Sequence, residues 1–389
     1  MANRSRPPVV KPPDPALDSA GAGQEPHAAL PPARGSGFQR VPLGLRKLLI
    51  AIVALFLFVL ALELLKKGAG PLGPFLTNTL GIQNATNTLG FGWLVAYGVL
   101  SGSPVAAIAL SFFDQKVISD VQTFSMITGS RLGASFIVLF VGFLYYLRGH
   151  KRGSSIAIGV LCLIVTASIY LPAMAIGYWL LTGNWLDRFR LSSGSQLTGV
   201  LDVIYDPILG LITGRIGRYP WLIFLLGLGT LLTAFSLIDR ALPEMNAERS
   251  AFQGIGQRTY RPLAMFALGM AVTSVTLSVS VSLSILVPLS AKGFIRRENM
   301  LPYIMGANIT TFIDTLFAAL VMSGPAAFTI VLVEMVSVAL VSIIVLLTCY
   351  RPYERGAITV LDLIMRDNRT LGAFVAIMLV TPVVLLLWP

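Results

Sequence analysis

Charged residues are scarce in this chain, and their scarcity points to a membrane. Lysine, arginine, aspartate and glutamate make up 12% of the 389 residues, and hydrophobic residues make up 55%. A soluble domain is roughly 25% charged, so this composition excludes an ordinary soluble domain and indicates a polytopic membrane protein. The net charge of +11 does not indicate nucleic-acid binding, because many lysines and arginines fall in the N-terminal segment and in short loops. The expected surroundings are the lipid bilayer, with no nucleic-acid partner.

Cysteine and histidine are also nearly absent, with two residues of each. Cys162 and Cys349 both lie in apolar segments, so we expect no structural disulfide. His27 lies in the N-terminal segment and His150 in a basic loop, so no metal-ligand cluster is expected. The sequence shows no nucleophile–base pair and no phosphate-cradling loop. We therefore expect a protein that is not an enzyme and holds no cofactor or resident metal.

The hydrophobic residues form a series of long runs. Residues 1–44 are rich in proline, alanine and glycine and contain no apolar run, which predicts a disordered cytoplasmic tail rather than a signal peptide. A helix needs about 20 residues to cross the hydrocarbon core. The runs that we expect to cross are 46–65, 119–147, 154–182, 219–238, 299–322, 325–349 and 370–388.

Two further runs, 89–113 and 262–291, are interrupted near their centres. The first breaks at Leu100-Ser-Gly-Ser-Pro104 and the second around 277–282. The arms of the first, with about 12 and 10 residues, are roughly 15–18 Å long at 1.5 Å per residue. Such arms reach only the membrane midplane, so both runs predict re-entrant hairpins. The crossing runs 119–147 and 299–322 each contain a glycine segment and predict discontinuous helices.

These interruptions recur at a fixed spacing. Ser101 precedes Gly129 by 28 positions, Ser278 precedes Gly306 by 28, and the two copies are 177 positions apart. The basic loops place the two hairpins in opposite orientations, so we predict an all-α fold of two inverted repeats, 45–213 and 214–389. Each repeat contains one re-entrant hairpin and one discontinuous helix. The N-terminus would be cytoplasmic and the C-terminus outside, in the plasma (inner) membrane.

A second pair of segments also recurs, since 200–206 resembles 360–367. Both are short and carry acidic residues, which is consistent with interfacial helices that lie along the membrane surface. The run 197–213 is accordingly not expected to cross.

The paired serines and the segment Gly306-Ala-Asn-Ile-Thr-Thr311 resemble motifs of the type II sodium/phosphate cotransporter family. That family carries, in each of two inverted repeats, a Gln-Ser-Ser-Ser motif followed by a Gly-Ala-Asn-Ile-Gly-Thr-Thr motif. The resemblance covers roughly 46–366. This chain has leucine at 100 and 277 where the family has glutamine, Gly102 or Val279 for the middle serine, and Arg131-Leu132 for one Asn-Ile pair. The resemblance implies a sodium-coupled anion transporter, with phosphate the favoured substrate.

Hydroxyls and amides in the interrupted segments are the candidate site. Hydroxyls and unwound carbonyls suit Na⁺, and the N-termini of half-helices suit an oxyanion; alternatively, small serines permit close helix packing. The predicted substrate or ion ligands are Ser101, Ser103, Arg131, Ser278, Ser280, Gly306, Asn308, Thr310, Thr311 and Asp314. Transient Na⁺ binding is predicted at Ser278, Ser280, Asn308 and Thr310.

Arg131 is a charge at membrane depth, which indicates function by default. It has three interpretations. Its guanidinium could grip a tetrahedral oxyanion through paired hydrogen bonds. It could replace a bound cation as a built-in positive charge. It could also pair with an intramembrane acid, either Asp314 or Glu334. Asp314 could itself be a cation ligand or a proton carrier, and Glu334 is a weaker candidate for a proton relay.

These residues together favour a secondary active transporter that works by alternating access. The alternative is a passive channel, or a non-transporting membrane sensor or assembly subunit that retains the fold. Saturable uptake that depends on an ion gradient would separate the two. A homo-oligomer is compatible with either.

Overall fold

The structure, a computed structural model, describes residues 43–148, 152–183, 185, 195–241, 261–291, 295, 297–322 and 325–389. Within these ranges the chain forms helices, turns and bends and no strand, so the predicted all-α class is confirmed. The predicted N-terminal tail lies outside the described residues, except for its last two residues, which begin the first helix.

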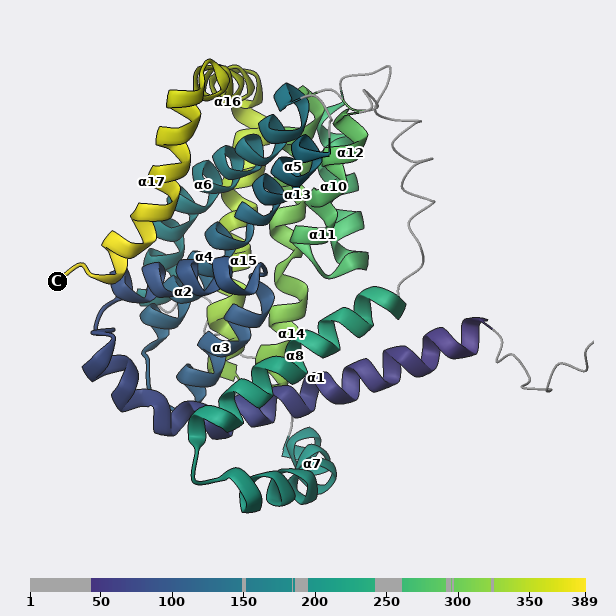
Figure 1. Cartoon of the computed structure of the whole chain (residues 1–389), viewed down its shortest axis with the longest axis vertical. Helices are drawn as coiled ribbons and strands as arrows, with labels where there is room; N and C mark the ends of the chain where they lie inside the picture. The colour runs from purple at the N-terminus through teal and green to yellow at the C-terminus, as the bar shows by residue number, and fades with distance from the viewer. Residues whose placement is uncertain are drawn as a thin grey trace, which may run out of the picture. The chain divides into compact units, whose positions relative to one another are not determined.

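Figure 1 shows the helices of the described residues. In chain order they are α1 (Leu43–Pro74), the π-helical turn η1 (Phe75–Thr79), α2 (Ala85–Val99), α3 (Ser103–Asp114), α4 (Asp120–Ala134), α5 (Phe136–Leu147), α6 (Arg152–Thr182), α7 (Ser195–Ile216), α8 (Pro220–Ala241), α10 (Pro262–Thr276), α11 (Val279–Ser284), α12 (Leu286–Ala291), α13 (Arg297–Thr310), α14 (Phe312–Met322), α15 (Pro325–Thr348), α16 (Tyr350–Met365) and α17 (Asn368–Leu386).

Several helical stretches are long and apolar enough to cross a membrane. In the described part of the chain there are 7 of them: Leu45–Thr79, Asp120–Leu147, Ile156–Thr182, Pro220–Ala241, Arg297–Met322, Pro325–Thr348 and Asn368–Leu386. Each coincides with a run that the sequence predicts to cross, so the expectation of a multi-pass membrane protein is confirmed. Neither α7 nor α16 is among them, as expected for the two recurring acidic segments.

The two interrupted runs break at leucines with the same backbone conformation. Helix α2 ends at Leu100 with φ 56°, and α10 ends at Leu277 with φ 50°. A left-handed conformation is uncommon for a residue other than glycine, so the surrounding packing holds both breaks. Each leucine is followed by a serine, and the Ser278 side chain accepts a hydrogen bond from the Val281 N–H at the start of α11. The breaks therefore lie where the sequence places them.

The interruptions within the crossing runs are smaller than expected. Helix α4 gives way to α5 at Ser135, and α13 to α14 at Thr311. The glycine segments that precede these residues are helical. At Ser135 the side chain donates to the Leu132 carbonyl, and such back-bonding competes with regular helix geometry. The predicted discontinuities are thus single-residue irregularities at the C-terminal ends of the glycine segments.

Glycines bring α2 against α4 and α10 against α13 at close range. A Cβ atom at any of these glycines would overlap backbone atoms of the facing helix. The facing pairs are Gly129 with Leu89, Gly306 with Phe266, Gly92 with Met126, and Gly269 with Tyr303. Each residue of the α2–α4 pairs has its counterpart 177 positions later in the α10–α13 pairs. Small residues of this kind let membrane helices approach closely, and they fix the helices that carry Arg131 and Asn308.

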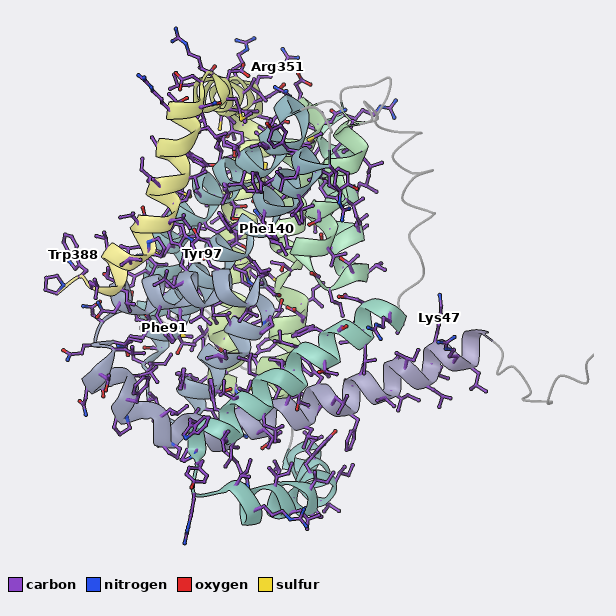
Figure 2. All side chains as sticks on the ribbon, in the orientation of Figure 1. Lys47, Phe91, Tyr97, Phe140, Arg351 and Trp388 are labelled. Atoms are coloured by element: carbon purple, nitrogen blue, oxygen red, sulfur yellow. The ribbon has the colours of Figure 1, made fainter. Side chains whose placement is uncertain are left out.

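Helix α17 is fastened to α2, far away in the sequence. The Asn87 amide donates to the carbonyls of Leu386 at 2.9 Å and Trp388 at 2.7 Å, and the Tyr97 hydroxyl donates to Met378 at 2.9 Å. Figure 2 shows Tyr97 beside α17 and Trp388 at its end. Helices α1 and α8 likewise run side by side (Figure 1), and a Cβ at Gly68 on α1 would overlap the backbone of α8.

Candidate functional site

Two parts of the chain meet at Arg131: helices α2–α5, called the first unit, and helices α10–α14, called the second unit. Arg131 lies buried where α4 of the first unit meets α14 of the second. Its side chain, on the last turn of α4, is only 2% exposed. Its Nη1 atom donates to the hydroxyls of Ser103 on α3, at 3.3 Å, and of Thr311, at 3.2 Å. Its Nη2 atom donates to the Thr315 hydroxyl on α14. One guanidinium therefore joins segments that lie 28 and 180 or more positions away in the chain.

Asp314 is linked to Arg131 mainly through a hydroxyl. Thr315 accepts a hydrogen bond from Arg131 and donates one to Asp314 Oδ1 at 2.9 Å, whereas Arg131 Nη2 and Asp314 Oδ1 are 3.9 Å apart. The Phe312 ring centroid lies 4.8 Å from the Arg131 Cζ atom, within the range of a cation–π contact. Of the two acids that the sequence offers as ion-pair partners, the structure brings Asp314 within salt-bridge distance.

Gly102 makes room for the arginine. A Cβ atom at this position would lie 3.3 Å from Arg131 Nη1, 3.1 Å from the Ser130 carbonyl oxygen and 3.2 Å from the Ala134 Cβ atom. These contacts are tight enough that the guanidinium would have to shift. Both Gly102 and Arg131 differ from the motifs of the family that the sequence resembles. In the structure, the small glycine at 102 leaves room for the large arginine at 131.

Glu334 lies on the other side of the same cluster, on α15. It is 2% exposed, and its Oε1 atom accepts a hydrogen bond from the Thr128 hydroxyl at 2.9 Å. Thr128 precedes Arg131 by three positions on α4, and Arg131 is close enough to interact electrostatically with Glu334. Among the described residues, Glu334 Oε2, Asp314 Oδ2 and Arg131 Nε have no hydrogen-bond partner.

The predicted residues of the second unit face different neighbours. The Asn308 side-chain amide donates to the Thr166 hydroxyl on α6 at 3.3 Å, and the Asn308 backbone carbonyl accepts from the Tyr170 hydroxyl at 3.1 Å. The Thr310 hydroxyl donates to the Met270 carbonyl at 3.1 Å. Thr310 thus fastens α13 to α10, in the same packing contact as Gly306.

Four predicted residues are therefore assembled into one cluster: Ser103, Arg131, Thr311 and Asp314. Ser101 is half-buried at the first break and Ser278 caps α11 at the second. The side chain of Ser280 lies outside the described residues.

The proposed sodium ligands are not gathered around one point by the contacts that the structure describes. The Ser278 hydroxyl caps a helix, and Asn308 and Thr310 bond to α6 and α10 respectively. In the described residues, no group of three or more His, Cys, Asp or Glu side chains could hold a metal ion.

Sequence reasoning missed several members of the buried network. Ser282 is fully buried, accepts from Thr273 at 2.8 Å and hydrogen-bonds the Tyr303 hydroxyl at 2.8 Å. The alternating hydroxyls single out the tract that contains Ser282 but not the hydroxyl that faces inward. Thr128 had a signal, because its spacing of three places it on the same helix face as Arg131. No sequence pattern pointed to Tyr170, which lies in an unbroken apolar run.

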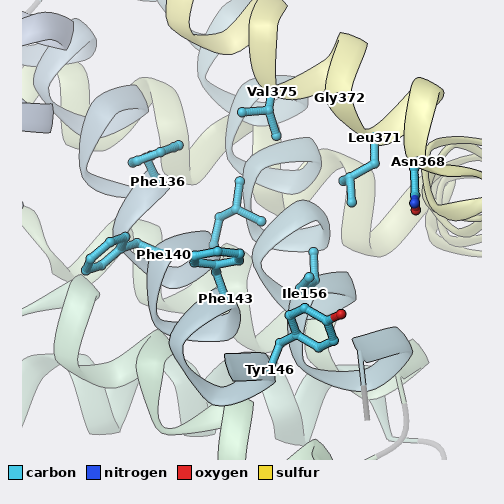
Figure 3. A pocket seen from close by; sticks show the side chains of 10 residues that line it. Phe136, Phe140, Phe143, Tyr146, Ile156, Asn368, Leu371, Gly372 and Val375 are labelled. Atoms are coloured by element: carbon cyan, nitrogen blue, oxygen red, sulfur yellow. The ribbon is translucent and has the colours of Figure 1, made fainter. Parts of the chain in front are cut away.

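A groove of about 540 Å³ lies apart from this cluster, between α5, α6 and α17 (Figure 3). Its lining is almost wholly apolar: Phe136, Leu139, Phe140, Phe143, Tyr146, Ile156, Asn368, Leu371, Gly372 and Val375. No predicted site residue lines it. In Figure 3 Asn368 and the Tyr146 hydroxyl stand at one end of the groove. Such a surface suits contact with apolar chains and offers no charge to an inorganic ion.

Comparisons with models of protein families, with curated proteins and with solved structures found no match for this chain. Function is therefore inferred from the residues and contacts described above.

Proposed function

We propose that this protein is a secondary active transporter that carries an inorganic oxyanion, with phosphate favoured, across the plasma (inner) membrane by alternating access. The observation that supports this most is the buried Arg131, whose guanidinium contacts Ser103 of the first unit and Thr311 and Thr315 of the second. A charged side chain held inside a bundle of membrane helices marks a substrate or ion pathway by default.

The two interrupted units act as the two halves of the transporter in this proposal. Helix α2 has 15 residues and is roughly 22 Å long at 1.5 Å per residue, short of the roughly 30 Å hydrocarbon core; α10 also has 15 residues. This length is too short for a crossing and favours re-entrant hairpins whose tips lie inside the hydrocarbon core. The equal offset of the two leucine breaks and of the glycine contacts supports a duplicated, inverted arrangement.

Arg131 is the proposed oxyanion ligand of the first half. A planar guanidinium presents paired donors to a tetrahedral anion, and its Nε atom is without a hydrogen-bond partner among the described residues. The contact with Asp314 is long, at 3.9 Å, and Thr315 bridges it. An entering oxyanion can therefore take the place of the carboxylate without the loss of a short ion pair.

Alternating access would then consist of making and breaking the contacts of Arg131. Ser103 lies on α3 and Thr315 on α14, so motion between these helices opens the cluster toward one side. Ser101, Ser278, Ser280 and Asn308 would join the substrate when the units close. The family resemblance implies sodium near Thr310 as the coupling ion, and the two buried acids beside Arg131 offer a proton as the alternative.

Flux measurements on purified protein in proteoliposomes test the proposal. Uptake of radiolabelled phosphate, sulfate and other oxyanions is measured with imposed sodium or proton gradients. We expect saturable, gradient-dependent uptake of at least one oxyanion. Arg131→Lys should raise the KM about tenfold or more, because it loses a hydrogen bond to a charged partner, which contributes about 1.5–3 kcal/mol. The matched control Arg148→Lys, at the exposed end of α5, should leave the KM unchanged.

One observation favours the alternative of a protein that retains the fold without coupled transport. Arg131 already has internal partners on both sides, and these bonds fasten α4 to α14. Flux that is not saturable and ignores every gradient would indicate a channel. Absence of flux for the whole panel, in protein that remains folded, would indicate a sensor or assembly subunit.

A further inference from the structure

The buried cluster contains one cation and two acids, and the two acids differ in their surroundings. Arg131, Asp314 and Glu334 are 2%, 6% and 2% exposed. Asp314 accepts from Thr315 and lies within 4 Å of the guanidinium. Glu334 receives a single hydrogen bond, from Thr128, and its second oxygen has no partner in the described structure. Arg131 thus pairs with Asp314 at 3.9 Å, and Glu334 forms no salt bridge with any of the described residues.

The groups that face Glu334 can be named for each helix packed against α15. Helix α4 contributes Thr128 and Arg131, and α6 contributes the Tyr170 hydroxyl, which interacts electrostatically with both Arg131 and Glu334. Helix α14 contributes Asp314, which lies 3.9 Å from the guanidinium. Helices α3, α13 and α16 also pack against α15.

We infer that Glu334 carries the proton whose movement is coupled to that of the anion, an inference that rests on the proposed transport function. In the proposed cycle the carboxyl holds a proton while the cluster is closed. It releases its proton to water on one side of the membrane, when the cluster opens there, and takes up a proton from water on the other side. At Glu334 only a proton is exchanged with water, and no electrons move.

Charge balance explains why anion and proton move together. With Glu334 protonated, Arg131 and Asp314 cancel, so the cluster is neutral. An oxyanion beside Arg131 adds negative charge in a dry site, where an uncompensated charge is strongly unfavourable. The anion therefore strengthens proton binding at Glu334, and by linkage the proton strengthens anion binding by the same factor.

The surroundings of Glu334 suit a proton better than a metal cation. A sodium ion needs several oxygen ligands around it, and the one oxygen bonded to Glu334 is the Thr128 hydroxyl. A proton needs only the free carboxyl oxygen. Asp314 is less suited to the role, because its Oδ1 atom already accepts from Thr315 and lies 3.9 Å from Arg131.

The decisive variant is Glu334→Gln, which keeps the side-chain shape and an acceptor for Thr128 but cannot exchange a proton. In proteoliposomes with labelled inorganic phosphate, an acidic exterior and no sodium, net uptake by this variant should fall at least tenfold. Exchange of phosphate at equal concentration and equal pH on both sides should stay within about twofold of the unaltered protein. A pH-sensitive dye inside the vesicles should report proton entry only for the unaltered protein.

The control Glu354→Gln makes the same chemical change on α16 and should leave both activities unchanged. Because pH alters the charge of phosphate equally for every variant, the comparison between variants isolates the residue. The inference is overturned if Glu334→Gln retains proton-driven uptake, or if it loses exchange as well, since the carboxyl would then serve binding or folding. It also fails if uptake by the unaltered protein follows sodium and ignores pH. The proposed transport function itself is overturned by the absence of both uptake and exchange for every oxyanion tested, or by flux that is not saturable and ignores every gradient.

Discussion

The contact between Arg131 and Asp314 predicts a large energetic coupling inside the bundle. We consider Arg131→Met, Asp314→Asn and the double variant. Arg131→Met leaves a buried carboxylate without its cation, and breaking a buried pair in this way costs about 3–5 kcal/mol of folding free energy. At the observed separation of 3.9 Å, two unit charges attract by about 4 kcal/mol for an effective dielectric constant of 20. Desolvation and the Thr315 bridge reduce this, so we expect a coupling energy of about 1–3 kcal/mol.

A surface pair offers a matched control. Arg297 and Asp362 are also 3.9 Å apart, but their side chains are 41% and 65% exposed. Water screens such a pair, so the cycle Arg297→Met and Asp362→Asn should give a coupling below about 1 kcal/mol. The free energy of unfolding is measured by titrating the purified protein in mixed micelles with sodium dodecyl sulfate. A buried-pair coupling no larger than the surface value would refute the view that Arg131 and Asp314 act as a unit.

Three further predictions concern the scaffold. Gly306→Ala should destabilise the protein by about 1–3 kcal/mol, because its Cβ would overlap the facing backbone. Gly98→Ala, with open space around it, should instead stabilise the protein by about 0.5–1 kcal/mol. Unfolding titrations measure both changes, and equal effects on the free energy of unfolding would contradict the packing. Asn87→Ala should expose the C-terminal turn of α17 to faster hydrogen exchange, and unchanged exchange there would show that the amide does not hold it. The backbone N–H of residue 370 lowers the pKa of Asp367, an N-cap, so its stabilising contribution is complete above the ordinary aspartate pKa of about 3.9 and is lost as the pH falls below it. Exchange protection of the first turn of α17, corrected for intrinsic rates, should fall in that range, and Asp367→Ala should abolish the pH dependence.

The membrane segments and their breaks could be predicted because they depend on local composition. A run of about 20 apolar residues has few alternatives to a crossing helix, and a serine–glycine cluster within such a run marks an interruption. The breaks at Leu100 and Leu277 followed from this reasoning. The small size of the interruptions at Ser135 and Thr311 could not be predicted in this way, because glycine in a tightly packed helix allows close approach of a neighbouring helix as readily as it allows a break.

The contacts of the site depended on tertiary packing. Asp314 and Glu334 both lie in apolar runs, and only the rotation of α14 and α15 about their axes places one beside the guanidinium and the other beside Thr128. The inward direction of Ser282 and the contribution of Tyr170 are likewise set by neighbouring helices. The match between Gly102 and Arg131 also depends on tertiary packing, and it could be inferred only from the positions of both residues in the structure.

The distance in sequence between Arg131 and its partners has a consequence for the biogenesis of the protein. Thr315 follows Arg131 by 184 positions, so at 5–20 residues per second the ribosome needs roughly 10–40 seconds to supply it. An arginine at the centre of a helix opposes insertion by about 2.5–3.5 kcal/mol. The stretches Asp120–Leu147 and Arg297–Met322, with hydropathies of 1.7 and 1.6, are the two least apolar of the candidate spans. During that interval the arginine of the nascent first half lacks Thr311, Asp314 and Thr315, so we expect the helix that carries it to become stable in the bilayer only after the second half has emerged.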